Sequence, residues 1–69
     1  MQEYKAVIKQ QGNWWYGWIE EIPGVNCQEQ SEKELLETLR VTLSEAIEFN
    51  RQEALNSASS DFREVHIAV

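Results

Sequence analysis

Cysteine and histidine each occur only once in the 69 residues, as Cys27 and His66. A single cysteine excludes an internal disulfide, and one cysteine with one histidine cannot close a tetrahedral metal site within the chain. The three glycines are well separated, so no glycine-rich phosphate loop exists. No local motif places a nucleophile beside His66 either. The sequence therefore predicts a protein that is not an enzyme and has no catalytic residue, metal or cofactor.

Basic residues are also few: six Lys and Arg stand against 12 Asp and Glu, which gives a net charge of −6. Nucleic-acid binders need clustered Lys and Arg to neutralise phosphates, and here the cations are scattered. We therefore expect no direct binding to nucleic acid. An acidic surface instead suits a basic protein partner, whose approach it accelerates. The alternative is that the negative charge only keeps a small protein in solution.

No apolar run approaches the ~20 residues that a membrane span requires. The first residues also lack the basic start and apolar stretch of a signal peptide, so we expect a cytoplasmic protein without membrane contact. Residues 1–69 suffice for a single domain, which buries only about 60% of its unfolded surface. Such small domains depend on a metal, disulfides or a partner. Only the last option remains, which predicts a homo-oligomer or a bound partner protein.

Four segments are predicted to form β-strands. Alternation over residues 3–10 predicts a first strand, and residues 14–21 predict a second strand that is apolar on both faces, joined to the first by a turn at Gly12 and Asn13. Pro23 and Gly24 end the second strand, and residues 25–28 predict a short third one. Residues 62–69 alternate again and predict a last strand.

The clearest element is a helix that begins at Ser31. Ser31 and Glu34 form a capping box, the Ser-x-x-Glu pattern that satisfies two backbone donors at a helix start. The apolar stripe predicted behind this cap comprises Leu35, Leu36, Leu39, Leu43, Ala46 and Ile47. We expect the helix to fray near Asn56, before a polar loop at 56–60. The sequence thus predicts an α+β fold in which one helix packs on one face of a small antiparallel sheet, in the order β-β-β-α-β.

The predicted second strand carries aromatic residues on both faces. Because the helix can cover only one face, the surplus aromatic surface predicts a contact site for a protein, with stacking on a sugar as the alternative. The last predicted strand contains neither proline nor lysine, which leaves it open to pairing between subunits. The candidate contact residues are Trp14, Trp15, Tyr16, Trp18, Glu20, Glu21, Val65 and Ile67.

The order of these segments resembles that of the HicB-like antitoxins. The motifs that carry the resemblance are the turn Ile22-Pro23-Gly24-Val25, the capped helix start and the helix segment Glu45-Ala46-Ile47. Further positions that match the family pattern are Tyr4, Gly12, Tyr16, Glu21, Ser31, Glu34 and Leu36. Two positions depart from it: Glu20 stands where the family often has proline, and Glu29 where it often has glycine. The chain resembles a short form without the C-terminal DNA-binding segment of many members.

The resemblance implies a partial ribonuclease-H-like fold and the role of an antitoxin in a type II toxin–antitoxin system. Such an antitoxin binds and occludes a small basic HicA-type toxin that cuts mRNA. One alternative is an orphan homo-oligomeric HicB-like domain that binds a small or sugar ligand through its tryptophan-rich strand. Another is DNA binding by a symmetric oligomer, as in longer relatives.

Overall fold

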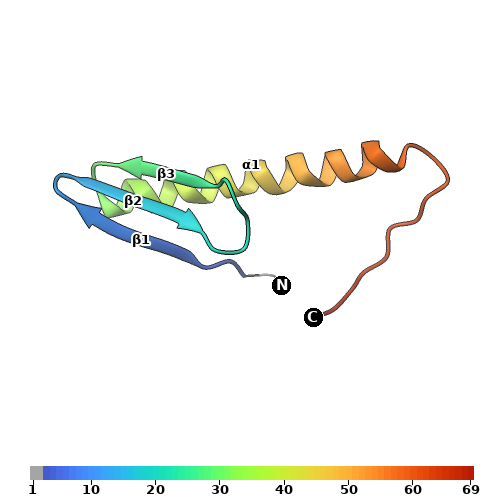
Figure 1. The fold of residues 1–69 in the computed structure, drawn as a ribbon, viewed down its shortest axis with the longest axis horizontal. Helices are drawn as coiled ribbons and strands as arrows, with labels where there is room; N and C mark the ends of the chain where they lie inside the picture. The colour runs from blue at the N-terminus through green and yellow to red at the C-terminus, as the bar shows by residue number, and fades with distance from the viewer. Residues whose placement is uncertain (1–2) are drawn as a thin grey trace.

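The computed structural model describes residues 3–69, which form a three-stranded sheet and one helix (Figure 1). The elements are β1 (Ala6–Gln11), β2 (Trp14–Ile19), β3 (Asn26–Glu29) and α1 (Glu32–Ala58). The sheet is antiparallel throughout, in the order β1-β2-β3. The predicted α+β fold, with one helix against one face of a small antiparallel sheet, is confirmed.

Local signals place the turn and the helix start where the sequence predicts them. Gly12 adopts φ +63° in the turn between β1 and β2, a conformation that L side chains rarely take. Ser31 caps α1, and its Oγ accepts a hydrogen bond from the Glu34 backbone N–H at 3.2 Å. The Ser31 hydroxyl also donates to Glu34 Oε1 at 3.1 Å. Each of these features depends on a few neighbouring residues.

The strand boundaries differ slightly from those predicted. β1 begins at Ala6 rather than at residue 3, and β2 ends at Ile19 rather than at residue 21. The ladder nevertheless continues by one bond, because the Glu20 backbone N–H donates to the Lys5 carbonyl at 2.9 Å. β3 is shifted by one residue, and α1 runs to Ala58, slightly beyond the predicted fraying point.

The core lies between α1 and the two strands β2 and β3. Its buried members are Ile19, Val25, Leu35 and Leu39. Leu43 and Ala46 continue the contact along α1, so part of the predicted stripe is confirmed. Leu36 is a correction, because its side chain is 45% exposed. The sheet meets α1 along a narrower strip than the apolar pattern suggests.

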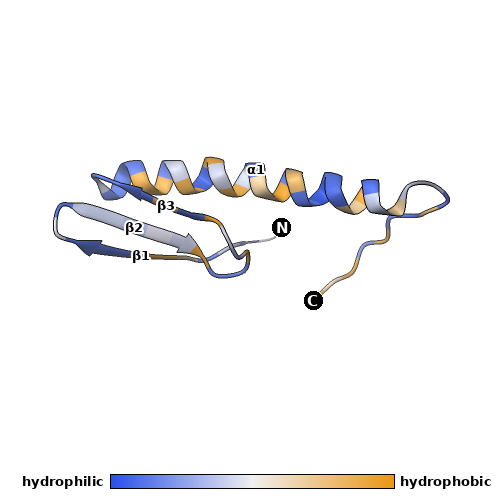
Figure 2. Cartoon of the chain, turned by 45° about the horizontal axis from the view of Figure 1, so that its top comes forward, coloured by the Kyte–Doolittle hydropathy of each residue, from blue (hydrophilic) through white to orange (hydrophobic). Residues whose placement is uncertain are grey.

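α1 is much longer than the sheet that it covers (Figure 1). Its contacts with the core end at Ala46, and we call the remainder, from Ile47 to Ala58, the overhang. Figure 2 shows that apolar residues recur along α1 past the end of the sheet. The molecule therefore measures 52 × 23 × 16 Å, with a radius of gyration of 15.2 Å. A compact chain of this length has a radius of gyration of about 11 Å.

The predicted last strand is wrong in this structure. Residues 62–69 have no strand partner in the part of the chain that the structure describes and are exposed throughout, although they follow an extended path back along the overhang (Figures 1 and 2). The physical reason is the length of α1, which releases the chain well beyond the sheet. The order observed within residues 3–69 is therefore β-β-β-α.

Candidate functional site

The two faces of β2 have different surroundings. Ile19 is 6% exposed and packs with the helix residues Leu35 and Leu39. Gly17 is on the same face of β2, toward α1. A Cβ built on it would lie 2.8 Å from Leu39 Cδ1 and 3.1 Å from Leu35 Cδ2. The absence of a side chain at Gly17 thus allows α1 to approach the sheet closely. Because side chains alternate along a strand, the even-numbered residues of β2 face away from α1.

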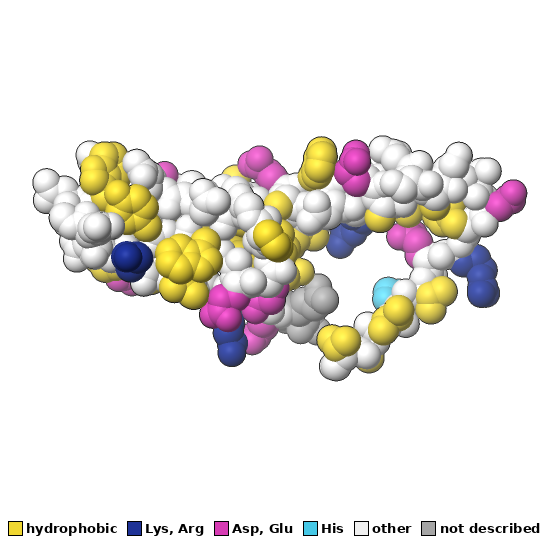
Figure 3. All heavy atoms as spheres, in the orientation of Figure 1, with side chains coloured by type: hydrophobic (Ala, Val, Ile, Leu, Met, Phe, Trp, Pro, Cys, Tyr) yellow, Lys and Arg dark blue, Asp and Glu magenta, His cyan; other side chains and the backbone are white. Residues whose placement is uncertain are grey.

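The face of the sheet opposite α1, which we call the open face, is centred on Trp14, Tyr16 and Trp18. Trp14 is 39% exposed and Trp18 is 41% exposed, while Tyr16 is partly buried. Their cross-strand partners are Gln11, Lys9 and Val7 on β1, together with Gln28 and Asn26 on β3. In Figure 3 large hydrophobic side chains stand over the strands, next to a cation. The open face therefore combines aromatic surface with a polar frame.

A shallow hollow of about 270 Å³ opens on this sheet. It is lined by Lys9, Gln11, Tyr16, Gly17, Trp18, Asn26 and Cys27. Ligand pockets usually enclose about 300–1,000 Å³ and surround most of their ligand. A hollow of this size on an open surface suits the insertion of a side chain from another protein better than the enclosure of a metabolite.

The structure separates the predicted contact residues into four places. Trp14, Tyr16 and Trp18 lie together on the open face. Trp15 lies on the opposite face, where it is partly buried and packs against the core. Its role in the fold is therefore structural.

Glu20 and Glu21 follow β2 in an exposed turn at one end of the sheet. The Lys5 backbone N–H donates to Glu21 Oε1 at 3.0 Å, which ties this turn to the start of β1. The turn thus adds negative charge at the end of the strand that carries the aromatic side chains.

Val65 and Ile67 lie in the segment 62–69, away from the sheet. Their side chains are 68% and 84% exposed, respectively. A second hollow, of about 310 Å³, separates this segment from the overhang. It is lined by Arg51, Ala54, Leu55, Ala58, Phe62, Arg63, Glu64 and Val65. The segment is therefore not packed tightly against its own helix.

Cys27 and His66 occupy different parts of the molecule. Cys27 is partly buried between sheet and helix, with its Sγ 3.6 Å from Thr42 Oγ1, whereas His66 is exposed in the segment 62–69. Within the described residues, no group of three or more His, Cys, Asp or Glu side chains could hold a metal ion. Cys27 contributes to packing in this arrangement.

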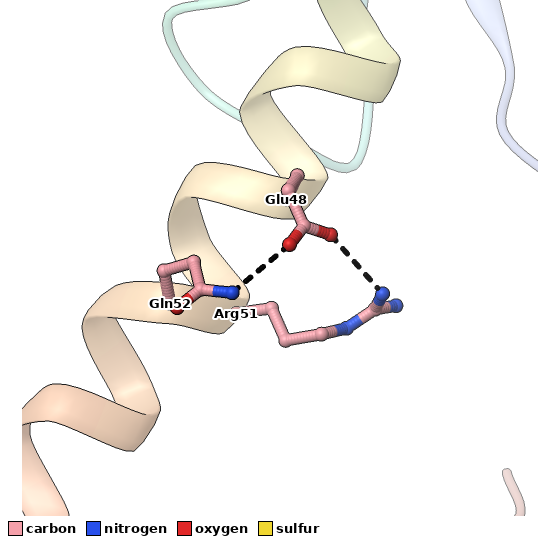
Figure 4. Close-up of polar contacts among 3 residues, drawn as sticks. All are labelled: Glu48, Arg51 and Gln52. Carbon is pink, nitrogen blue, oxygen red and sulfur yellow. Dashed lines mark hydrogen bonds and ion pairs between the residues drawn. The ribbon is translucent and has the colours of Figure 1, made fainter.

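The charged side chains are largely unpaired with one another. Among residues 3–69 the one ion pair joins Arg51 Nη1 and Glu48 Oε2 at 3.4 Å, and Glu48 also accepts from Gln52 Nε2 at 3.1 Å (Figure 4). Both partners of the ion pair are more than half exposed, so it adds little to stability. The negative charge of the chain therefore stays available to interact with other molecules.

Sequence reasoning missed the polar residues that line the hollow on the open face, namely Lys9, Gln11 and Asn26. The signal for the first two was present in the two-residue turn at Gly12 and Asn13. A turn of this length fixes the register of a hairpin, and it pairs Gln11 with Trp14 and Lys9 with Tyr16. Asn26 was harder to place, because the link from β2 to β3 has no such fixed geometry.

Within residues 3–69, no helix has the length and apolar character needed to cross a membrane. Comparison with protein-family models, with curated proteins and with solved structures gave no match. The relation to HicB-like antitoxins therefore stays a prediction from the sequence motifs.

Proposed function

We propose that this chain is a non-catalytic antitoxin that binds and occludes a small basic HicA-type toxin through the open face. The observation that carries the proposal is the pair of exposed tryptophans, Trp14 and Trp18, on a sheet face that no element of the described chain covers. Tryptophan is enriched among the residues that dominate binding energy at protein interfaces. The sequence resemblance supplies the identity of the partner.

The charge of the chain supports a basic partner. The net charge is −6, and Glu20 and Glu21 lie at the end of the aromatic strand. Carboxylates at the rim of an interface attract cations on the partner and raise the association rate. A toxin that binds mRNA needs cations for the phosphates, and the antitoxin would cover them. Because mRNA is the toxin's substrate, the proposal includes a cytoplasmic location.

The test is inhibition of RNA cleavage by a HicA-type toxin from the same organism. Purified chain at stoichiometric excess should abolish cleavage. Trp18→Ala should weaken toxin binding by about 30-fold or more, the effect of removing a residue worth at least 2 kcal/mol. The matched control is Phe49→Ala, which removes another exposed aromatic side chain, 65% exposed on α1. Unchanged cleavage with the intact chain would refute the proposal.

A second candidate is a domain that binds a small or sugar ligand on the same tryptophan-rich strand. The exposed side chains of Trp14 and Trp18 favour it, because a sugar can stack on an aromatic ring at an open surface without being enclosed. The measurement is quenching of tryptophan fluorescence by a panel of sugars in the absence of any toxin. Saturable quenching that Trp18→Phe removes would support this function, whereas an unaltered spectrum would leave the open face to proteins.

A further inference from the structure

The molecule exposes far more surface than a chain of its size needs to. Its accessible surface is 5995 Å², whereas a compact folded protein of 8.1 kDa exposes about 4,500 Å². The surplus of about 1,500 Å² exceeds the roughly 800 Å² that each partner buries in a standard protein interface. The overhang of α1 and the exposed segment 62–69 contribute to this surplus. They supply enough surface for a stable association between two copies.

Within residues 3–69, the sheet has a free edge along β1. The Glu20 N–H donates to the Lys5 carbonyl, so Lys5 directs its backbone groups toward the neighbouring strand. Because these directions alternate along an antiparallel strand, Ala6, Ile8 and Gln10 direct their N–H and C=O groups outward. α1 packs on β2 and β3 and leaves this edge uncovered. β1 contains no proline, so its outward N–H groups are all present, and its one lysine, Lys9, favours an added strand of opposite charge.

Segment 62–69 has the alternating composition of a β-strand, although it is unpaired within residues 3–69. One face of an extended chain here would carry Val65, Ile67 and Val69, and the other Glu64, His66 and Ala68. Val65, Ile67 and Val69 are all more than two-thirds exposed. While these apolar side chains are exposed to water, they contribute no hydrophobic stabilisation. The alternation matches a strand with one buried side.

The two faces of this segment match those of β1. Ile8 lies on the helix side of the sheet and packs against the core, whereas Lys5 and Lys9 lie on the open side. With Val65 and Ile67 placed beside Ile8, Glu64 would come to lie on the side of the two lysines. The apolar contact and the opposite charges thus both favour the same orientation of the segment relative to β1.

The segment cannot reach its own β1 to any useful extent. The overhang adds about 18 Å of helix beyond the core, and the eight residues of 62–69 span about 26 Å when extended. Most of that length is used in running back along the overhang (Figure 1). Within one copy of the chain, residues 62–69 therefore lie beside the overhang and not beside β1.

We propose that two copies of this chain form a symmetric dimer in which residues 62–69 of each copy pair with the free edge of β1 in the other. Each sheet then has four strands, and the exposed apolar face of the segment becomes part of a core. The open face with Trp14 and Trp18 stays accessible, because the added strand extends the sheet sideways. This assembly is independent of the proposed antitoxin role.

The test combines a mass measurement with a substitution at the edge. Light scattering on the intact chain should give twice 8.1 kDa. Gln10→Pro removes an outward N–H without removing a bond between β1 and β2, and proline is tolerated at sheet edges. It should weaken the dimer about tenfold or more, while far-UV circular dichroism stays unchanged. The matched control Gln10→Ala removes the same exposed side chain, keeps the N–H and should leave the dimer intact.

A charge exchange tests which strands meet. Glu64→Lys should weaken the dimer, and the further changes Lys5→Glu and Lys9→Glu should restore it. A monomeric intact chain at micromolar concentration would overturn the proposal. So would a dimer that Gln10→Pro leaves unaltered, because the copies would then associate through another surface.

Discussion

At the scale of single residues, Gly17 shows how one position sets the distance between two elements. Its missing side chain lets Leu35 and Leu39 descend onto β2, and both leucines are almost completely buried. The backbone at Gly17 is not in the left-handed region, so glycine is required there by space and not by conformation. Gly12 is the reverse case, with φ +63° and no atom within 4 Å of a Cβ built on it.

Gly17→Ala should therefore destabilise the fold by about 1–2 kcal/mol, because the added methyl group overpacks a buried contact. This net loss of unfolding free energy already includes an opposing gain of about 0.4–1 kcal/mol, because alanine restricts the unfolded chain more than glycine does. Urea unfolding followed by fluorescence measures the change. Gln28→Ala, at an exposed position of β3, is the control and should stay within about 0.5 kcal/mol of the original chain. A more stable Gly17→Ala variant would contradict the close approach of α1.

At the scale of elements, the features that could be predicted are those that depend on near neighbours. The cap at Ser31, the turn at Gly12 and the two faces of β2 all follow from a few adjacent residues, and the structure contains each of them. Leu36 could not be placed, because its apolar character fits the helical stripe but the sheet lies against another part of the helix surface. Packing against the sheet decides which side of α1 is buried, and the helical spacing of apolar residues does not specify that side.

The pairing of residues 62–69 could not be predicted for a similar reason. Alternation indicates that a segment suits a strand, but it does not say which edge is within reach. That depends on how far α1 extends past the sheet, which is the difference between the length of the helix and the length of the strands. In the open face, likewise, the alternation grouped Trp14, Tyr16 and Trp18, whereas Asn26 enters only through the pairing of β2 with β3.

Truncation of the two neighbouring helix residues Leu39 and Leu36 should show the difference between buried and exposed parts of the stripe. Leu39 is 2% exposed and Leu36 is 45% exposed. Leu39→Ala should cost about 2–4 kcal/mol of unfolding free energy through the cavity that it leaves. Leu36→Ala should cost less than about 1 kcal/mol. Chemical denaturation of both variants is the measurement, with Leu39→Val as a milder deletion if the alanine variant fails to fold. Equal losses would mean that α1 presents a different face to the sheet.

At the scale of the whole molecule, charge and shape act together. The chain carries 12 acidic residues, and the one ion pair among residues 3–69 lies on the overhang side of α1 rather than near the sheet. Within residues 3–69, the carboxylates beside the open face are therefore not paired with a cation. Their field extends over about a Debye length, ~10 Å at 0.1 M salt. A basic partner would meet this field before it meets the tryptophans.

The association rate with a basic toxin should consequently fall with salt more steeply than the dissociation rate rises. Between about 50 mM and about 500 mM salt we expect roughly a tenfold lower association rate, because screening removes the steering but leaves the aromatic contact in place. Neutralising the turn after β2 with Glu20→Gln and Glu21→Gln should lower the low-salt rate and flatten its salt dependence. Glu48→Gln, which removes a carboxylate already paired with Arg51, is the matched control and should change neither. Surface plasmon resonance resolves both rates. If salt acted mainly on dissociation, the carboxylates would be buried partners within the interface instead of a rim that steers the approach.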